Sequence, residues 1–495
     1  MQKILIANRG EIAIRIAQTC KKLNLIPCGI YSDADRSSLH LQHCKDAINI
    51  GGRLPQESYL DITKIIEAAK KLDCNLIHPG YGFLSENENF VNICKREGIT
   101  FIGPSTEAMA LAGDKVKAKK TASKVAPVIE GREVSSDIDA LALSENIGFP
   151  VILKAVEGGG GRGLRVVKTI DELKQAFLSS KNESLLSFGS DRIYIEKYIE
   201  NPRHIEVQIL SDNSNLLHLG ERECSIQRRH QKLIEETPSP ALSQEKRDQI
   251  TTVAKDIIKE MEYDNAGTVE FLFKNGEFYF MEVNARIQVE HPITEVVTGI
   301  DIVEQQIQIA TGEGLLLNQD DINFKGHAME CRINAEHPLS FVPYPGIVKN
   351  FVPPQGTNIR VDTALYSGYS IPIFYDSLIS KLICFGISRN EVIEKMKNAL
   401  LSFRITGIPS TIPFHISVLH DRRFIDGKYD TSFIDKMKTF AEKKGEIAAA
   451  IFAEIPKKLQ LIKIDEKNKE DKWLKNRLTW ISKYDTERNL SVWEE

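Results

Sequence analysis

Short apolar runs alternate with amphipathic stretches over the first hundred residues of the chain. Three runs are almost continuously apolar, as expected of strands buried on both faces of a parallel sheet: Lys3–Ala7, Cys28–Ser32 and Leu76–His78. Around them, apolar residues recur at helical spacing in Glu11–Leu23, Asp61–Leu72 and Asn87–Glu97. The alternation predicts a doubly wound α/β domain with a parallel sheet over residues 1–113.

The pattern changes after about Val128. A short apolar run at Val151–Lys154 is followed by a group of glycines, a second apolar run at Leu164–Val167 and a helical pattern from Asp171. Two strands joined by glycines and followed by a helix are typical of a small α+β unit. We interpret residues 128–202 as such a unit, placed to act as a mobile lid.

The rest of the chain divides into three further regions. Apolar runs of strand character dominate 204–234 and 266–284, so we assign them, together with the lid, to one domain of residues 114–325. Residues 326–440 form another α+β block with Pro/Gly turns. The mixed charges of 441–495 fit a docking element for a partner and a plain C-terminal helix equally well. The expected fold is multidomain, α/β and α+β.

Composition and charge exclude several classes of protein. A chain of 495 residues suits two to four domains, and 42% hydrophobic with 27% charged residues is ordinary for a globular protein. The net charge of -4 gives no reason to expect nucleic acid or an anionic membrane as a partner. We expect no signal peptide, because the chain opens on a strand, and no membrane span, because the apolar run Ile447–Ala453 is too short. Eight cysteines without a CxxC pair indicate a reducing compartment, with the cytoplasm as the default.

The glycine loop Gly158–Gly163 is the first feature that points to chemistry. Consecutive glycines let backbone N–H groups approach a phosphate closely. Nucleotide loops of the Walker or dinucleotide type run from a strand into a helix, whereas strand patterns flank this loop on both sides. We therefore interpret it as a hairpin tip that covers phosphates, with Lys154 supplying a positive charge, in preference to a flexible linker.

Two glutamates on neighbouring predicted strands are candidates for metal binding. Asn275-Gly276 marks a hairpin turn between Glu270 and Glu282. A two-residue loop would put the two acids on opposite faces, and an odd loop would set them directly opposite, with Asn284 on the same face. Facing carboxylates are destabilising unless a cation such as Mg²⁺ lies between them. The sequence leaves the register open, so one glutamate facing solvent is an equal alternative.

A polar string follows directly after these acids. Arg286, Gln288 and Glu290 alternate with apolar residues, so an extended segment would present them on one face. A guanidinium binds a planar oxyanion through paired hydrogen bonds, and a neighbouring carboxylate can accept a proton. These groups suit bicarbonate. The alternative is a polar strand edge with a helix cap.

From residue 1 to about 440 the chain resembles the biotin carboxylase family. The resemblance rests on several strings that occur together and in this order: Ile6–Ile12, His78–Asn87, Gly113-Asp-Lys115, Lys154 with Gly158–Gly163, Glu196–His204, Cys224–Lys232, Asn284–Pro292 and Glu330–Glu336. It implies an ATP-grasp domain with a lid at 114–325 and a C-terminal biotin carboxylase domain at 326–440. Glu157, at the entrance of the glycine loop, departs from relatives with a longer glycine run, but we expect no large effect.

The resemblance also implies roles for single residues. The residues implied to contact ATP are Lys115, Lys154, Gly160, Gly161, Glu196, Lys197, Ile199, His204, Gln227, His230, Glu270 and Glu282. Those implied to hold two divalent ions, Mg²⁺ or Mn²⁺, are Glu270, Glu282 and Asn284. Those implied to bind bicarbonate are Lys232, Arg286, Gln288, Val289 and Arg332. The implied catalytic set is Arg286, Glu290, Lys232 and Arg332, with Glu290 as the base and Arg332 stabilising the biotin enolate.

The implied reaction is the carboxylation of biotin with ATP and bicarbonate through carboxyphosphate. No Ala-Met-Lys-Met biotinylation motif occurs in the sequence, so biotin is expected on a separate carrier protein. The other expected partner is a carboxyltransferase on a further chain, and the expected state of this chain is a homodimer. The acceptor stays open among acetyl-CoA, propionyl-CoA and pyruvate.

Two alternatives to this reaction stay open. One is another ATP-grasp ligase of the carbamoyl-phosphate synthetase-like or purine-carboxylating kind, which would lack the set of Arg286, Glu290 and Arg332. The other is a silent nucleotide-binding subunit.

Overall fold

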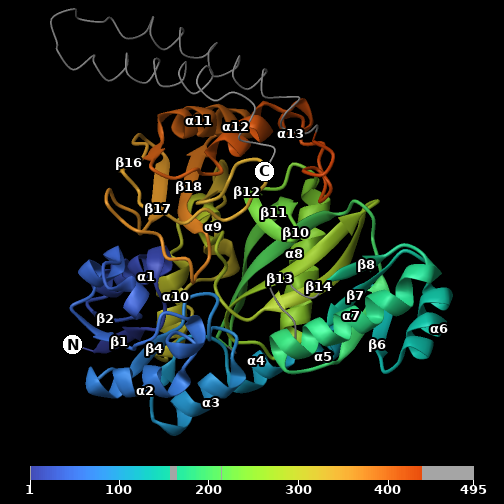
Figure 1. Ribbon diagram of the computed structural model, residues 1–495, viewed down its shortest axis with the longest axis horizontal. Helices are drawn as coiled ribbons and strands as arrows, with labels where there is room; N and C mark the ends of the chain where they lie inside the picture. Colours follow the sequence, from blue (N-terminus) through green and yellow to red (C-terminus); the bar gives the residue numbers. More distant parts are fainter. Residues whose placement is uncertain (1, 157–163, 213, 438–495) are drawn as a thin grey trace, which may run out of the picture. The chain divides into compact units, whose positions relative to one another are not determined.

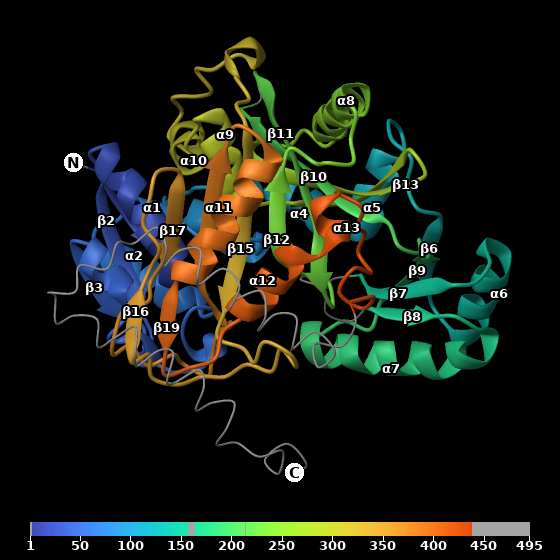
Figure 2. The same ribbon diagram turned by 90° about the horizontal axis from the view of Figure 1, so that it is seen from above.

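The computed structural model describes residues 2–156, 164–212 and 214–437 (Figures 1 and 2). The chain divides into two compact units, Met1–Met437 and Lys438–Glu495, and the description below concerns the first. The glycine-loop residues Glu157, Gly160 and Gly161 and the predicted docking segment after residue 440 lie outside the described residues. Within the described residues, no helix has both the length and the apolar character that crossing a membrane requires.

The N-terminal region forms the predicted doubly wound parallel sheet. Its strand order is β3 (Asp46–Asn49), β2 (Ile26–Tyr31), β1 (Lys3–Ile6), β4 (Leu76–His78) and β5 (Thr100–Phe101). Helix α1 (Gly10–Lys22) covers one face, and α2 (Ile62–Lys71) and α3 (Glu88–Arg96) cover the other (Figure 1). Ile4 packs in the core on the α1 side and Leu5 in the core beneath α2 and α3, which explains why this strand is apolar at both positions. Strand β3 was not predicted from the apolar pattern.

The predicted lid is a four-stranded sheet with two helices on it. Its strand order is β6 (Gly131–Val134), β9 (Ile193–Lys197), β7 (Val151–Ala155) and β8 (Arg165–Val167). Helices α6 (Asp137–Ile147) and α7 (Ile170–Phe188) pack on this sheet, and Leu153, Ile195 and Phe177 are buried between them. Strands β7 and β8 pair antiparallel, from Val151 opposite Val167 to Leu153 opposite Arg165. The strand–loop–strand arrangement predicted around the glycines is therefore confirmed.

A single eight-stranded sheet forms the centre of the molecule. Its strand order is β14 (Glu277–Asn284), β13 (Asn265–Lys274), β10 (Arg203–Ser211), β11 (Leu216–Arg228), β12 (Gln231–Thr237), β15 (His327–Asn334), β18 (Leu378–Gly386) and β17 (Ile359–Thr363). All neighbouring strands are antiparallel. Because β12 pairs with β15, hydrogen bonding continues across the boundary that we predicted at residue 326. The C-terminal block thus extends the sheet of the domain before it.

Helices cover this sheet on both sides. Helix α9 (His291–Thr298) packs against Ile383, whereas α11 (Arg389–Ser402) packs on the opposite side, where Cys384 Sγ lies 3.9 Å from Met396 Sδ. The remaining helices are α4 (Thr106–Gly113), α5 (Lys115–Ala122), α8 (Gln244–Glu260), α10 (Ile302–Ala310), α12 (Ile412–His420) and α13 (Arg422–Ile425). Strands β16 (Asn350–Val352) and β19 (Arg404–Thr406) form a separate pair.

Candidate active site

The β13–β14 hairpin places the two predicted metal acids opposite each other, by a route that the pattern did not reveal. The turn Asn275-Gly276 is a two-residue loop, with both residues at positive φ and Lys274 opposite Glu277. A two-residue loop alone would have separated the acids. The register shifts by one residue beyond Phe271, so Met281 is an extra residue on β14 and Glu270 faces Glu282. A β-bulge, rather than an odd loop, produces the pairing.

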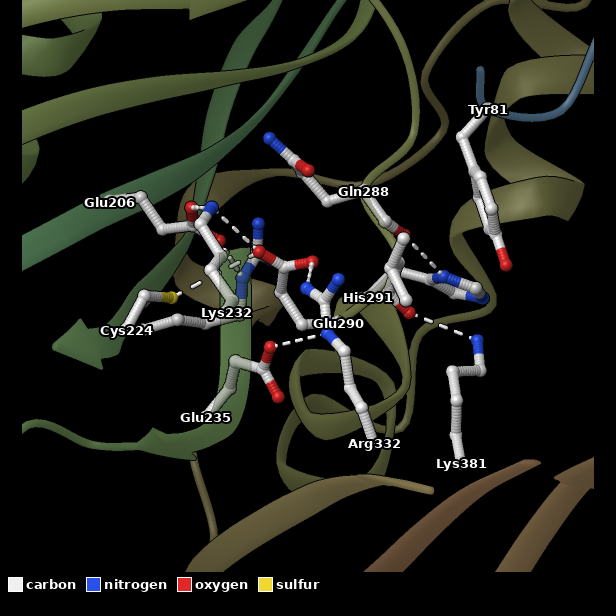
Figure 3. Close-up of polar contacts among 12 residues, drawn as sticks. Tyr81, Glu206, Cys224, Lys232, Glu235, Gln288, Glu290, His291, Arg332 and Lys381 are labelled. Atoms are coloured by element: carbon white, nitrogen blue, oxygen red, sulfur yellow. Dashed lines mark hydrogen bonds and ion pairs between the residues drawn. The ribbon is translucent and has the colours of Figure 1, made fainter. Parts of the chain in front are cut away.

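Lys232 on β12 lies among three buried carboxylates. Its Nζ donates to Glu206 Oε2 at 2.5 Å and to Glu290 Oε1 at 2.7 Å (Figure 3). It also donates to Glu270 Oε1 at 2.9 Å. Burial alone would lower the pKa of the ammonium, but the three carboxylates raise it well above its ordinary value. Lys232 is therefore a fixed cation at the centre of the site.

Glu290 occupies the N-cap position of α9, but its side chain does not cap the helix. It instead accepts hydrogen bonds from Lys232 at 2.7 Å and from Arg332 Nη2 at 2.8 Å. The glutamate is fully buried, which would raise its pKa, and the charges of Lys232, Arg332 and Arg222 hold that pKa well below the ordinary range. Glu290 is consequently ionised at neutral pH and held between two cations.

The segment after Asn284 is not the extended strand that we predicted. The chain bends at Ala285 and Arg286 and turns at Val289 and Glu290 before α9 begins. The side chains of Arg286 and Gln288 still meet, because the bends in the backbone bring them together where a strand would have placed them on one face. Arg286 Nη1 donates to Gln288 Oε1 at 3.0 Å and its Nη2 to Asn284 Oδ1 at 3.2 Å.

Gln288 and His204 connect the polar string to the metal acids. Gln288 Nε2 donates to Glu270 Oε1 at 3.2 Å, and His204 Nε2 lies 3.0 Å from Glu270 Oε2. Burial would raise the pKa of Glu270, but Lys232 and His204 lower it below its ordinary value. Both oxygens of Glu270 thus lie close to polar nitrogens, and the hydrogen bonds continue from Oε1 through Gln288 to Arg286.

The predicted phosphate contacts on the lid form a second charged cluster. Lys154 Nζ lies 2.5 Å from Glu196 Oε1, and Lys119 donates to Glu196 Oε2. Lys197 donates to the carbonyl oxygens of Gly148 and Phe149, both at 2.9 Å. The other predicted ATP residues are placed as follows: Lys115 at the start of α5, Ile199 after β9, Gln227 near the end of β11, and His230 in the exposed β11–β12 turn at φ 64°.

Several charged residues of the site escaped the sequence reasoning. Glu86 accepts from Arg286 Nε at 3.0 Å and from the backbone N–H of Ala285 at 3.1 Å. Arg222 is fully buried and donates to Glu206 Oε1 at 2.5 Å. Glu206 gave a signal that could have been followed, because polar residues alternate with apolar ones along Arg203–Ser211. Lys119 lies one helical turn after Lys115 and gave no such signal.

Lys381 on β18 ties the polar string to the N-terminal domain. Its Nζ donates to the carbonyl oxygen of Val289 at 2.9 Å and lies 3.0 Å from Glu11 Oε1. The same oxygen of Glu11 accepts the hydroxyl of Tyr81. Lys381 is fully buried, so this ammonium has no access to solvent. The position of Val289 therefore depends on three distant parts of the chain.

The acids of the site suit a divalent cation. His204, Glu206 and Glu270 each offer one ligand atom, and these atoms lie within 4.8 Å of one another. Glu282 faces Glu270 across the hairpin, and Asn284 faces Thr268. Carboxylate and amide oxygens fit Mg²⁺, which takes oxygen ligands and retains positions for substrate phosphates. The lysines predicted to contact those phosphates belong to the charged cluster around Glu196.

Comparison with known proteins places this chain in a family. Residues 1–109 match the biotin carboxylase N-terminal domain, 114–318 the ATP-binding domain of the carbamoyl-phosphate synthase L chain, and 330–436 the biotin carboxylase C-terminal domain. Biotin carboxylase 1 of Bacillus subtilis is 47% identical over 442 residues, which are 88% of this chain and 98% of that protein. The chain belongs to the biotin carboxylase family.

Solved structures of biotin carboxylases share the fold. The enzyme of Campylobacter jejuni, solved as a β,γ-ATP complex, has a TM-score of 0.86 and 47% identity, covering 88% of this chain and 98% of its own. The biotin carboxylase domain of the Hydrogenobacter thermophilus 2-oxoglutarate carboxylase, a dimer with MgADP and bicarbonate, has a TM-score of 0.86 and 43% identity over 88% and 97% of the two chains. The expected family and fold are thereby confirmed.

A component of a pyruvate carboxylase is similar as well. The solved biotin carboxylase subunit of that enzyme is 44% identical, has a TM-score of 0.74 and is matched over 88% of this chain and 98% of its own. Biotin carboxylases of this architecture are therefore found in enzymes with different acceptors.

The facing acids of this biotin carboxylase allow a direct test. Replacing Glu282 with Gln removes one charge and keeps the shape of the side chain. Because losing an outer-shell partner already costs a metal site about 10–100-fold in affinity, we expect at least a ~10-fold higher Mg²⁺ requirement for ATP hydrolysis. Glu277→Gln, at the exposed turn end of the same strand, is the matched control. A normal Mg²⁺ titration for Glu282→Gln would contradict the metal assignment.

Proposed function

We propose that this chain carboxylates biotin held on a separate carrier protein, in the first half-reaction of an acyl-CoA or 2-oxo-acid carboxylase. Membership of the family establishes the class of enzyme, a ligase that carboxylates biotin with ATP and bicarbonate. The proposal adds the roles of the residues. The single observation that supports it best is the position of Glu290 between Lys232 and Arg332.

The pairing of Glu290 explains how its basicity can depend on substrate. Without an anion in the site, both cations bind the carboxylate and lower its pKa. Bicarbonate would bind the same two cations, Lys232 and Arg332, and so compete with Glu290 for them. Losing these partners raises the pKa of Glu290 at the moment when its carboxylate lies close to the bicarbonate proton that it removes. The carboxylate thus becomes a better proton acceptor when the substrate is in place.

The remaining roles follow from charge. Removing its proton lets bicarbonate attack the γ-phosphate of ATP, which forms carboxyphosphate and releases ADP. Lys154 and the glycines Gly158–Gly163 would hold the phosphates during this transfer. Glu270, Glu282 and Asn284 would bind Mg²⁺, which supplies positive charge to the phosphates during transfer. Arg332 would then stabilise the enolate of biotin. Phosphoryl transfer and carboxylation of biotin both develop negative charge on oxygen, which a fixed cation stabilises.

The partners are proposed from the kind of relatives that match. Biotin carboxylase 1 and the biotin carboxylase component of pyruvate carboxylase are each covered by this chain over 98% of their lengths, as expected of separate subunits. We assign the biotinylated carrier and the carboxyltransferase to other chains, and a homodimer to this one. All eight cysteines are free, and seven of them are buried, which suits a cytoplasmic enzyme. Identifying the transferase that co-purifies with the chain would identify the acceptor.

Residues 441–495 are proposed to bind one of these partners. The family match ends at residue 436, and relatives such as biotin carboxylase 1 are covered almost completely without the extra segment. Deleting 445–495 should therefore leave free-biotin carboxylation within about twofold of the full chain, the usual effect of changes away from the core. Gel filtration with the partner subunits measures assembly. If the truncated chain is soluble and still assembles normally with the partner subunits, residues 441–495 are not a docking element.

ATP turnover tests the proposed function as a whole. The purified chain should hydrolyse ATP slowly with Mg²⁺ and bicarbonate, and free biotin should accelerate the reaction. The biotinylated carrier should be carboxylated faster still, since contacts away from the reacting group help to position it. If turnover is indifferent to bicarbonate, another ATP-grasp ligase explains the site better. If ATP binds without turnover, the chain has a silent nucleotide-binding role.

A further inference from the structure

Two buried glutamates face each other beneath the active site. Glu235 on β12 pairs in register with Glu330 on β15, and both side chains are fully buried. Like charges directly opposite each other in a sheet are destabilising, and more so without water to screen them. The pair therefore needs either a cation between the two carboxylates or a proton on one of them.

The described residues supply only one of the hydrogen bonds that two carboxylates require. Glu235 Oε1 accepts from Arg332 Nε at 2.6 Å. Glu235 Oε2 and both oxygens of Glu330 are buried without a hydrogen-bond partner in the described part of the chain. Lys381, the cation opposite Arg332 on β18, is bound to the Val289 carbonyl and to Glu11. Among the described residues, no cation is thus bonded to Glu330.

The charges around the pair do not compensate for its burial. The pKa of Glu235 is raised to about 7, chiefly by burial and in part by Glu290, while Arg332 and Lys232 oppose the rise. Burial also raises the pKa of Glu330 well above its ordinary value, and there Lys381 and Arg332 oppose Glu235 and Glu290. The neighbouring groups that stay neutral, because burial raises the pKa of each well above its ordinary value, are Tyr81, Cys224 and Cys331.

We propose that Glu235 and Glu330 hold one proton between them and act as a pair to position Arg332 for carboxyl transfer. The proposal rests on the proposed role of Arg332 toward biotin. Glu235, bonded to Nε, fixes the guanidinium plane, so that Nη2 reaches Glu290 (Figure 3). Glu330, kept neutral, prevents a second buried negative charge from accumulating behind Arg332. The site keeps its net attraction for anions only while this proton is present.

The proton makes the carboxylation step sensitive to high pH. Removing it adds a negative charge beside Arg332, which weakens the attraction for bicarbonate and for the enolate that forms next. We expect biotin carboxylation to fall on the alkaline side as the pair loses its proton. ATP affinity should be unaffected, because the nucleotide contacts lie elsewhere.

Two variants separate these roles. Glu330→Gln is permanently neutral, so it should keep carboxylation at neutral pH within about threefold and extend activity by about one pH unit on the alkaline side. Glu235→Gln leaves Arg332 Nε with a weaker acceptor, so biotin carboxylation should fall by about 10–100-fold at every pH, the loss of one charge-assisted hydrogen bond. ATP affinity should stay within about twofold in both variants. If Glu330 had a purely structural role, the pH at which carboxylation falls on the alkaline side would be the same in Glu330→Gln as in the parent.

Infrared spectroscopy of the full chain tests the proton without using activity. The parent at neutral pH should show the C=O stretch of a buried protonated carboxyl group, and Glu330→Gln should lose it. Absence of this band in the parent overturns the proposal even if the variants do not fold, as does an unchanged alkaline limb in folded Glu330→Gln. If ATP turnover ignores bicarbonate while the band is present, the proposed function fails and the protonated pair stands.

Discussion

Glu290→Gln is expected to lower bicarbonate-dependent ATP turnover by about 10²–10⁴-fold, the usual range for loss of a general base. The variant keeps the size of the side chain, and its amide oxygen can still accept from one of the two cations, Lys232 or Arg332, that bond to the glutamate. It cannot take the proton of bicarbonate. Nucleotide affinity should stay nearly unchanged, because the predicted phosphate contacts lie around Glu196. Turnover and ATP binding, measured separately, distinguish lost chemistry from lost structure.

Glu67→Gln is a suitable control for this experiment. Glu67 lies on α2 with 59% of its side chain exposed, far from the polar network. It should retain the turnover of the parent. Near-normal turnover in Glu290→Gln would show that the carboxylate has a structural role, and the base would then have to be sought elsewhere in the site.

Lys232→Met is expected to abolish turnover and to destabilise the fold at the same time. The methionine fills a similar volume but leaves Glu206, Glu270 and Glu290 buried around an uncharged group. Removing one partner of a buried ion pair typically costs about 3–5 kcal/mol in the free energy of unfolding. The rate should fall at least ~10²-fold, the effect of losing one oriented donor to a developing charge. Urea unfolding and ATP turnover at pH 7 measure both effects.

The double variant Lys232→Met/Glu290→Gln sharpens this prediction. It should be more stable than Lys232→Met alone, because one of the three carboxylates that lose Lys232 is now neutral. If the two sites were independent, their costs in the free energy of unfolding would add. Lys71→Met, with 67% of its lysine side chain exposed on α2, is the control. Equal stability of Lys232→Met and the parent would mean that the carboxylates take up protons instead of depending on this ammonium.

Local pattern accounts for much of the fold and part of the site. Strand β1 could be predicted because both of its faces are buried, so the run Lys3–Ile6 is recognisable by itself. The strand–loop–strand arrangement of the lid was predictable from the short apolar runs on either side of the glycines. The register of Glu270 and Glu282 was not, because it depends on the bulge at Met281. The pattern of polar and apolar residues in β14 does not show which residue lacks a partner.

Long-range pairing explains what the pattern missed. Strands β12 and β15 are separated by some ninety residues of chain, yet they pair to make one sheet. The contact of Glu86 with Arg286 joins positions 200 residues apart, and nothing near either residue indicates it. Glu235 and Glu330 each look like ordinary charged strand residues in the sequence. Only their register makes them a buried pair.

The contacts of Lys381 set a limit on how this enzyme can be divided. One ammonium on β18 is bonded to the Val289 carbonyl and to Glu11 of α1, so it joins all three predicted domains. A fragment of residues 114–325 would lack both the lysine and its acidic partner. Such a fragment, expressed alone or transplanted into another ligase, would carry Glu290 on a turn without this anchor. Fragment complementation should restore carboxylation only when the N-terminal and C-terminal pieces are supplied together.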